Sequence, residues 1–263
     1  MATTDKETVE TSYPLSHHLE ELRKRIGYVI CFWIILFFLC FWQNKFIKDF
    51  VTRPLRPYIE NNTVEVVTLY PLEGFLAVLK MAMLASLFFC IPFMLYQVWR
   101  FVSPGLYKRE RRYLLGVVIS GLFLFLAGAA FVYIFVFPLG FKFFVSFSET
   151  LNIKNTWSLT LHMSLILKML IAFGGVFELP VVIFFLAKIG IVNAEMLRKY
   201  RKFAIIGIFI IAAIITPPDV ISQLMMAAPL LLLYEISIFI AKIFNPKPAE
   251  AGEKDSETND IYQ

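Results

Sequence analysis

Two ionisable side chains deep inside apolar stretches are the first candidates for chemistry in this sequence. Glu178 lies roughly 14 Å from the nearer end of its apolar run by helical rise, and Lys168 lies about 15 Å away along the same run. A charge near the middle of a bilayer costs about 2.5–3.5 kcal/mol on insertion scales. We therefore expect Glu178 to be protonated or paired with a group outside its own helix. Two interpretations stay open, a proton-carrying site and a neutral acid hydrogen-bonded inside a bundle.

Residue sets typical of enzymes are not found in the sequence. The histidines His17, His18 and His162 are not at metal-ligand spacing. There is no nucleophile elbow, glycine-rich phosphate loop or pair of intramembrane aspartates. The sequence thus predicts a protein that is not an enzyme and that holds no metal or cofactor.

The composition predicts the class of protein that must position Glu178 and Lys168. Hydrophobic residues make up 59% of the 263 positions, 28 of them are Phe, and only 17% of residues are charged. A chain of this kind is predicted to be an all-α integral membrane protein of several spans. The formal net charge of +5 does not indicate nucleic-acid binding, because the basic residues occupy short segments between apolar runs.

The apolar runs predict six membrane-spanning helices, because a helix needs roughly 20 apolar residues to cross the hydrocarbon. We expect the fifth and sixth spans to be short, and the fifth to be about 20 Å long, which would thin the bilayer around it. Pro92, Pro180 and Pro229 should kink the second, fourth and sixth spans. The six spans are expected at about 26–42, 74–98, 113–137, 162–186, 203–215 and 220–240.

The distribution of basic residues predicts the orientation in the membrane. Most of the 25 Lys and Arg residues lie before the first span or in the segments 99–112 and 187–202. These segments fall on one side of a six-span arrangement, so we expect both termini to be cytoplasmic. The predicted organisation is one membrane domain over 15–244, flanked by disordered tails at 1–14 and 245–263, with a partly helical loop at 43–73 on the outer face.

An amphipathic turn leads into the first span. Apolar residues from Leu15 to Ile26 follow a helical period, and Glu20, Glu21, Lys24 and Arg25 lie on the opposite face. Local pairing at i, i+4 would contribute only about 0.3–0.5 kcal/mol per pair. From spacing alone, these charges are most simply interpreted as a solvated helix face.

Several of these stretches occur together in one known family. The run His18–Arg25 resembles the amino-terminal signature of TatC, the multispanning receptor subunit of the twin-arginine protein translocase. The other matching runs, in the same order as in that family, are 96–101, 103–112, 177–180 and 216–223. The resemblance covers roughly residues 14 to 244.

The resemblance implies a function and a binding site. In that family, folded proteins bearing a signal with two adjacent arginines are exported across the bacterial inner membrane or thylakoid, driven by the proton-motive force. Glu21 and Glu110 are then expected to receive the arginine pair, and Arg23 and Phe101 are expected beside the signal peptide. A guanidinium fork matches a carboxylate bidentately, whereas lysine offers only a point charge. The bases around Glu110 are expected to repel the signal's arginines unless they hold Glu110 in place or anchor the loop at lipid phosphates.

The resemblance also implies an assembly. It predicts a curved, glove-like bundle in which Glu178 faces the concave interior. Thr216 and Gln223 are expected to border the docking surface for small single-span subunits of the TatA and TatB type, although Gln223 at the start of its span could simply cap the first turn. The protein is expected in the bacterial inner membrane as part of an oligomeric complex without nucleic acid.

Two other functions compete with the receptor. The first is a proton-coupled small-solute transporter that uses Glu178 and works in isolation. The second is a passive scaffold, which would not distinguish paired arginines from paired lysines.

Overall fold

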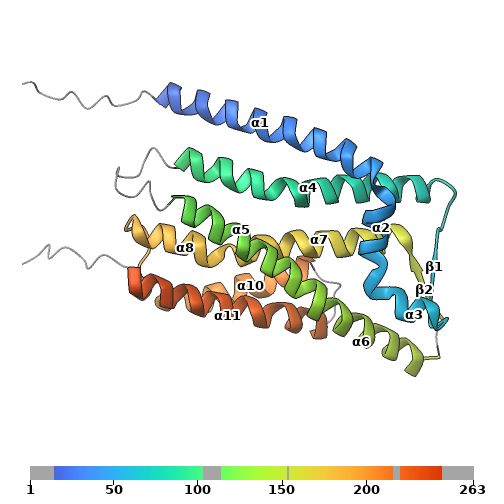
Figure 1. Cartoon of the computed structure of the whole chain (residues 1–263). Coiled ribbons are helices and arrows are strands. Elements are labelled where there is room, and N and C mark those ends of the chain that lie inside the picture. The colour runs from blue at the N-terminus through green and yellow to red at the C-terminus, as the bar shows by residue number, and fades with distance from the viewer. Residues whose placement is uncertain (1–14, 103–113, 153, 216–219, 245–263) are drawn as a thin grey trace, which may run out of the picture.

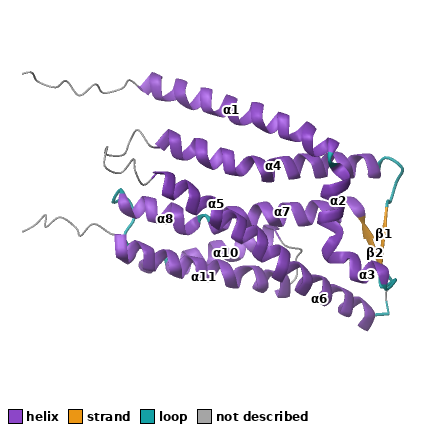
Figure 2. Ribbon diagram, in the orientation of Figure 1, coloured by secondary structure: helices purple, strands orange, loops and turns teal. Residues whose placement is uncertain are grey.

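The computed structural model describes residues 15–102, 114–152, 154–215 and 220–244. The chain forms a bundle of helices with one small two-stranded sheet (Figures 1 and 2). The predicted all-α membrane class is confirmed. Of the expected site residues, Glu110 and Thr216 lie outside the described residues. Both tails, 1–14 and 245–263, also lie outside them, so their predicted disorder stays a prediction.

The bundle has two distinct ends. We call the end at which the first helix starts and the last helix stops the terminal face, because Leu15 and Phe244 lie there (Figure 1). The opposite end, which carries the sheet and short helices, is the loop face. Which face is cytoplasmic follows only from the distribution of basic residues and stays a prediction.

The first two long helices lie side by side. Helix α1 (Leu15–Trp42) is continuous for 28 residues, so the amphipathic turn and the first span form one element. Helix α4 (Glu73–Val102) runs back along it toward the terminal face (Figure 1). Apolar side chains of α1 such as Phe38 and Trp42 are exposed, as expected for a helix that faces lipid.

The third apolar run forms a longer rod than expected. Helix α5 (Leu114–Phe131) continues through a π-helical turn at Val132–Val136 into α6 (Phe137–Thr150), well beyond the predicted end at 137. Helix α7 (Leu159–Phe177) packs along α5 and α4. At Glu178 the helix is interrupted, and α8 (Leu179–Lys188) begins with Pro180 in its first turn, close to the predicted kink.

The last helices differ in length. After the short α9 (Ala194–Lys199), helix α10 (Arg201–Ile215) has 15 residues, or about 22 Å, against the roughly 30 Å of the hydrocarbon. Helix α11 (Val220–Phe244) has 25 residues and is longer than the short sixth span expected from the sequence, because its apolar pattern continues past position 240. Five stretches are long and apolar enough to cross a membrane within the described residues, and α10 is not among them.

The loop face is ordered by helices and by a strand pair. The predicted helical structure in 43–73 is present as α2 (Asn44–Thr52), a 3-10 turn at Arg53–Leu55 and α3 (Arg56–Glu60). The strand β1 (Val64–Val67) then pairs in parallel with β2 (Asn155–Ser158). The sequence patterns did not predict this pairing, which joins two loops far apart in the chain.

A buried carboxylate fastens the same region to the bundle. The Glu73 side chain, at the start of α4, is only 1% exposed and accepts hydrogen bonds from the Leu69 N–H and from the Ser158 hydroxyl. The Thr160 hydroxyl donates to the Glu73 carbonyl at 3.5 Å. The start of α4 is thereby tied to the β2–α7 junction. Glu73 was not a candidate from the sequence, where it looks like an ordinary helix-start acid.

The helices at the centre approach each other closely through glycines. A Cβ atom at Gly128 of α5 would lie 2.7 Å from the Phe173 carbonyl oxygen of α7. In the other direction, a Cβ atom at Gly174 of α7 would lie 2.4 Å from the ring of Phe125. Small residues at such contacts allow membrane helices to pack backbone against side chain.

We expect Gly128→Ala to lower the apparent unfolding temperature in detergent by several degrees, because its nearest neighbour is backbone that cannot rotate away. The matched control is Gly116→Ala in the same helix, where an added Cβ meets nothing within 4 Å. This control should be neutral or slightly stabilising through helix propensity. Equal effects of the two substitutions in a thermal unfolding assay would contradict the proposed α5–α7 contact.

Candidate functional site

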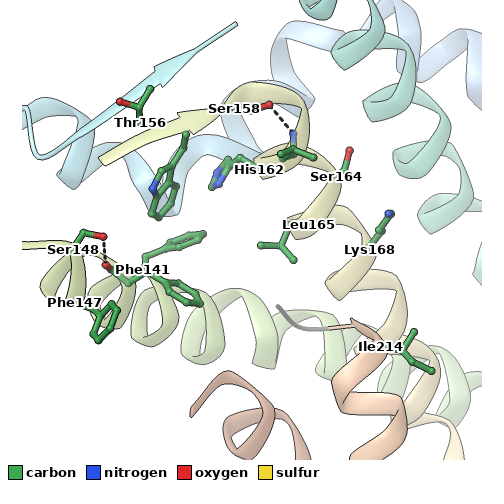
Figure 3. Close-up of a pocket in the computed structure, with 13 residues that line it drawn as sticks. Phe141, Phe147, Ser148, Thr156, Ser158, His162, Ser164, Leu165, Lys168 and Ile214 are labelled. Atoms are coloured by element: carbon green, nitrogen blue, oxygen red, sulfur yellow. Dashed lines mark hydrogen bonds between the residues drawn. The ribbon is translucent and has the colours of Figure 1, made fainter. Parts of the chain in front are cut away.

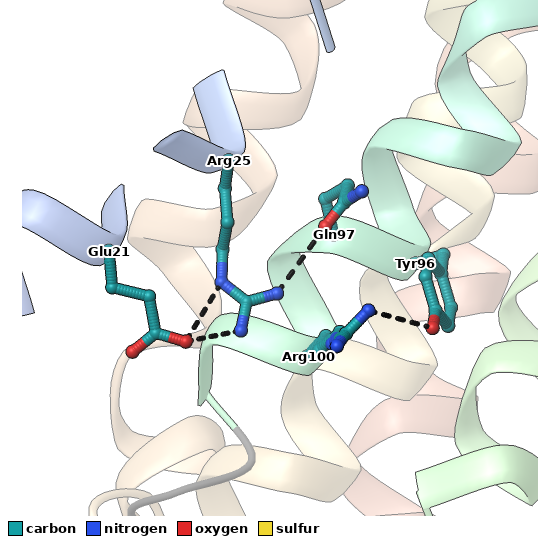
Figure 4. Close-up of polar contacts among 5 residues, drawn as sticks. All are labelled: Glu21, Arg25, Tyr96, Gln97 and Arg100. Carbon is teal, nitrogen blue, oxygen red and sulfur yellow. Dashed lines mark hydrogen bonds and ion pairs between the residues drawn. The ribbon is translucent and has the colours of Figure 1, made fainter. Parts of the chain in front are cut away.

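Arg25 is the centre of a polar cluster near the terminal face, where α1 meets α4. Its Nε donates to Glu21 Oε1 at 3.2 Å, and its Nη2 makes a second, shorter contact with the same oxygen. Its Nη1 donates to Gln97 Oε1 at 3.3 Å (Figure 4). The Arg25 side chain is 13% exposed and that of Glu21 is 28% exposed. An arginine thus links an acid of α1 to an amide of α4.

A neighbouring ion pair with the same spacing has a different environment. Lys24 and Glu20 are 2.9 Å apart, but their side chains are 62% and 51% exposed. Exposed pairs of this kind contribute little to stability. The sequence therefore predicted both i, i+4 pairs correctly, but it did not show that the Arg25 pair is mostly buried and bonded to a second helix.

The end of α4 adds aromatic residues at the same face. Arg100 Nη1 donates to the Tyr96 hydroxyl at 3.5 Å (Figure 4), and the Trp99 ring packs edge-on against Phe185 at 5.0 Å. Phe101 is half-buried in the last described turns of α4, and Arg23 is exposed on α1. The structure thus brings the Glu21 helix and the Phe101 helix together at one face.

Glu178 is buried at the junction of α7 and α8, away from this cluster. Its side chain is 6% exposed, and neither carboxyl oxygen has a hydrogen-bond partner among the described residues. Gly121 of α5 provides the space, because a Cβ atom there would lie 2.9 Å from Glu178 Oε2. Gly121 was missed from the sequence. Its signal, a glycine in the middle of an apolar run, is shared by several other glycines.

Gln223 connects the last two helices. Its Nε2 donates to the Phe209 carbonyl of α10 at 3.1 Å, so the amide reaches across to α10 rather than only capping its own helix. At the other end of the pair, Arg201 Nη2 lies 2.7 Å from Glu235 Oε2. These two polar contacts fix the short α10 against α11. Gln223 joins α10 to α11 and Glu178 lies between α7 and α8, so neither residue belongs to the Arg25 cluster of α1 and α4.

These features define a multispanning, all-α membrane protein that presents an arginine–carboxylate cluster at one face and holds a carboxyl group inside its bundle. The family model for the Sec-independent protein translocase protein (TatC) matches residues 17–229. The chain belongs to the TatC family.

Individual relatives match along most of the chain. The "Sec-independent protein translocase protein TatC" of Desulforapulum autotrophicum is 41% identical over 261 residues, which is 96% of this chain and 93% of the relative. The protein of that name from Helicobacter pylori is 40% identical over 245 residues, or 93% of this chain and 92% of the relative. A crystal structure described as "Twin Arginine Translocase Receptor- TatC" is 37% identical and superposes with a TM-score of 0.78, covering 86% of this chain and 99% of that chain.

Arg25→Ala should lower the free energy of unfolding by about 1–3 kcal/mol, since it removes the charged donor that contacts both Glu21 and the buried Gln97. Lys24→Ala, which breaks the exposed pair one position earlier, should change it by less than about 0.5 kcal/mol. Thermal or denaturant unfolding in detergent measures both. If the two variants were equally stable, Arg25 would not brace α1 against α4.

Glu178→Gln should leave the apparent unfolding temperature unchanged or raise it. The amide has the shape of the carboxyl group but carries no charge that the apolar surroundings must accommodate. Glu178→Ala, which empties the space beside Gly121, should lower the unfolding temperature. A large loss of stability in the Gln variant would show that the charged carboxylate has a stabilising partner.

Proposed function

We propose that this chain is the receptor subunit of a twin-arginine translocase and binds signal peptides with two adjacent arginines at the terminal face. The proposal is supported by the family membership and by the likeness to a solved structure of a protein described as a twin arginine translocase receptor. The observation that carries it is the contact in which Glu21 already accepts two nitrogens of a guanidinium group at the α1–α4 junction. We take this internal contact as support for a carboxylate that can receive an arginine of a signal peptide.

The chemistry favours arginine over lysine at such a site. A planar guanidinium offers a fork of parallel donors, while an ammonium is a compact, strongly hydrated point charge. Helix α4 ends and α5 begins at the terminal face, and Glu110 lies between them in the sequence (Figure 1). We propose that Glu21 and Glu110 each take one arginine of the pair. Arg23 and Phe101, which lie on the same two helices as the Arg25 cluster, would border the peptide.

Further partners are proposed for the opposite edge of the bundle. The short α10, braced by Gln223, leaves a hydrophobic mismatch that a small single-span subunit of the TatA or TatB type would cover. We place Thr216 and Gln223 at that docking surface and Glu178 within reach of a helix entering the bundle. In this proposal the protein works in a multi-subunit complex of the bacterial inner membrane with both termini in the cytoplasm. It is not an enzyme and requires no cofactor.

Binding of labelled signal peptides to the purified protein in nanodiscs tests the receptor role. We expect a peptide with Arg-Arg to bind at least about tenfold more tightly than one with Lys-Lys, since each lost bidentate contact costs more than about 1 kcal/mol. Glu21→Gln should remove most of that preference, and Glu110→Gln should act similarly. Glu20→Gln is the matched control, because it alters the adjacent, exposed acid.

Two results would contradict the proposal. One is equal affinity of folded protein for the two peptides, which would favour a passive scaffold. The other is an arginine preference that survives Glu21→Gln but disappears in Glu20→Gln, which would place the site at Glu20 and its exposed pair instead of at Glu21.

A further inference from the structure

A pocket of about 960 Å³ lies on the loop-face half of the bundle, between α6, β2 and α7, and reaches the end of α10. One wall is aromatic, because Phe141, Phe144 and Phe147 follow one another at three-residue spacing on one side of α6. Across from this wall stand Lys168 of α7 and Ile214 of α10 (Figure 3). The pocket is separate from the Arg25 cluster and from Glu178.

Lys168 is a cation without a counter-charge among the described residues. It follows the first residue of α7 by nine positions, or about 14 Å of helical rise, and it makes no hydrogen bond or ion pair with the described part of the chain. Its side chain is exposed at the pocket. An ammonium group at this depth is costly unless an anion or water reaches it.

The short helix α10 explains how an anion reaches that depth. Ile214 is next to the last residue of α10 and lines the same pocket as Lys168, so the end of α10 is level with the middle of α7. Because α10 is about 22 Å long, the bilayer beside it must thin by about 8 Å from its usual 30 Å. This thinning brings the lipid headgroups on the loop-face side closer to the Lys168 ammonium.

We propose that this pocket binds one anionic phospholipid from the leaflet on the loop-face side. The lipid phosphate pairs with Lys168, and an acyl chain lies along the aromatic wall of α6. His162 fits a site of mixed polarity, since it lines the pocket between the rings of Phe141 and Trp157 and its Nε2 has no partner among the described residues. The proposal does not depend on signal-peptide binding.

Quenching of Trp157 fluorescence by brominated lipids measures occupancy of the pocket directly, because Trp157 lines it. The measurement uses the full chain in detergent with Trp33, Trp42 and Trp99 replaced by Phe, so that Trp157 is the remaining tryptophan of the four. Brominated phosphatidylglycerol, which is anionic, is titrated against brominated phosphatidylcholine, whose headgroup has no net charge. We expect half-maximal quenching by phosphatidylglycerol at about tenfold lower concentration, the ratio that corresponds to one charge-assisted contact.

The substitution Lys168→Gln should abolish the preference for phosphatidylglycerol, and Lys168→Arg should keep it. The matched control is Lys80→Gln, which removes another exposed lysine of a spanning helix outside the pocket and should leave the preference intact. Equal quenching by the two lipids, or a preference that survives Lys168→Gln, would overturn the proposal. Displacement of the lipid by millimolar inorganic phosphate would also overturn it, because a soluble anion without a chain would then be sufficient.

Discussion

The cost of placing charge in hydrocarbon constrains the whole structure. The helices satisfy their own backbone groups, so the side chains decide which surfaces can face lipid. Several charged residues are accordingly paired with an opposite charge or a hydrogen-bonding group. Arg25 is held between Glu21 and Gln97 near one face and Arg201 by Glu235. At the other face, Glu73 accepts from a loop N–H and from the hydroxyl at the end of β2. The side chains of Glu178, buried inside the bundle, and Lys168, exposed at the pocket, make no hydrogen bond or ion pair with the described part of the chain, and there we infer protonation or a partner from outside the chain.

Length mismatch is the second constraint, and it acts through α10. In the predicted six-span arrangement, the 15-residue α10 is shorter than the bilayer that its longer neighbours require, and we predict a thinner membrane on that side of the bundle. The polar contacts of Gln223 and Arg201 hold α10 against α11. Both the proposed docking of small subunits and the proposed lipid site arise at this edge, because it is where the bilayer is least well matched.

Local patterns in the sequence predicted the helices, but they did not predict contacts between residues that lie far apart in the chain. Apolar run lengths located the spanning helices and the short α10, and Pro180 marked the break beside Glu178. The pairing of β1 with β2 was not predictable, since each strand has four residues and the partner lies about ninety positions away in the chain. For the same reason, spacing predicted the contact of Glu21 with Arg25 but not the role of Gln97, and it singled out Glu178 but not the opposing Gly121.

The Arg25 contact bears on how a receptor of this kind could select its ligand. Under the proposed function, a signal arginine that approaches Glu21 meets a carboxylate already neutralised by a guanidinium. Exchange of one guanidinium for another gains little energy, so one contact cannot supply high affinity. Two linked arginines on two carboxylates can, because the second contact forms at high effective concentration once the first is made. Lysines would have to displace, with a point charge, an arginine that donates to Glu21 through two nitrogens. An internal arginine on Glu21 thus raises the threshold for binding and favours ligands that carry arginines in pairs.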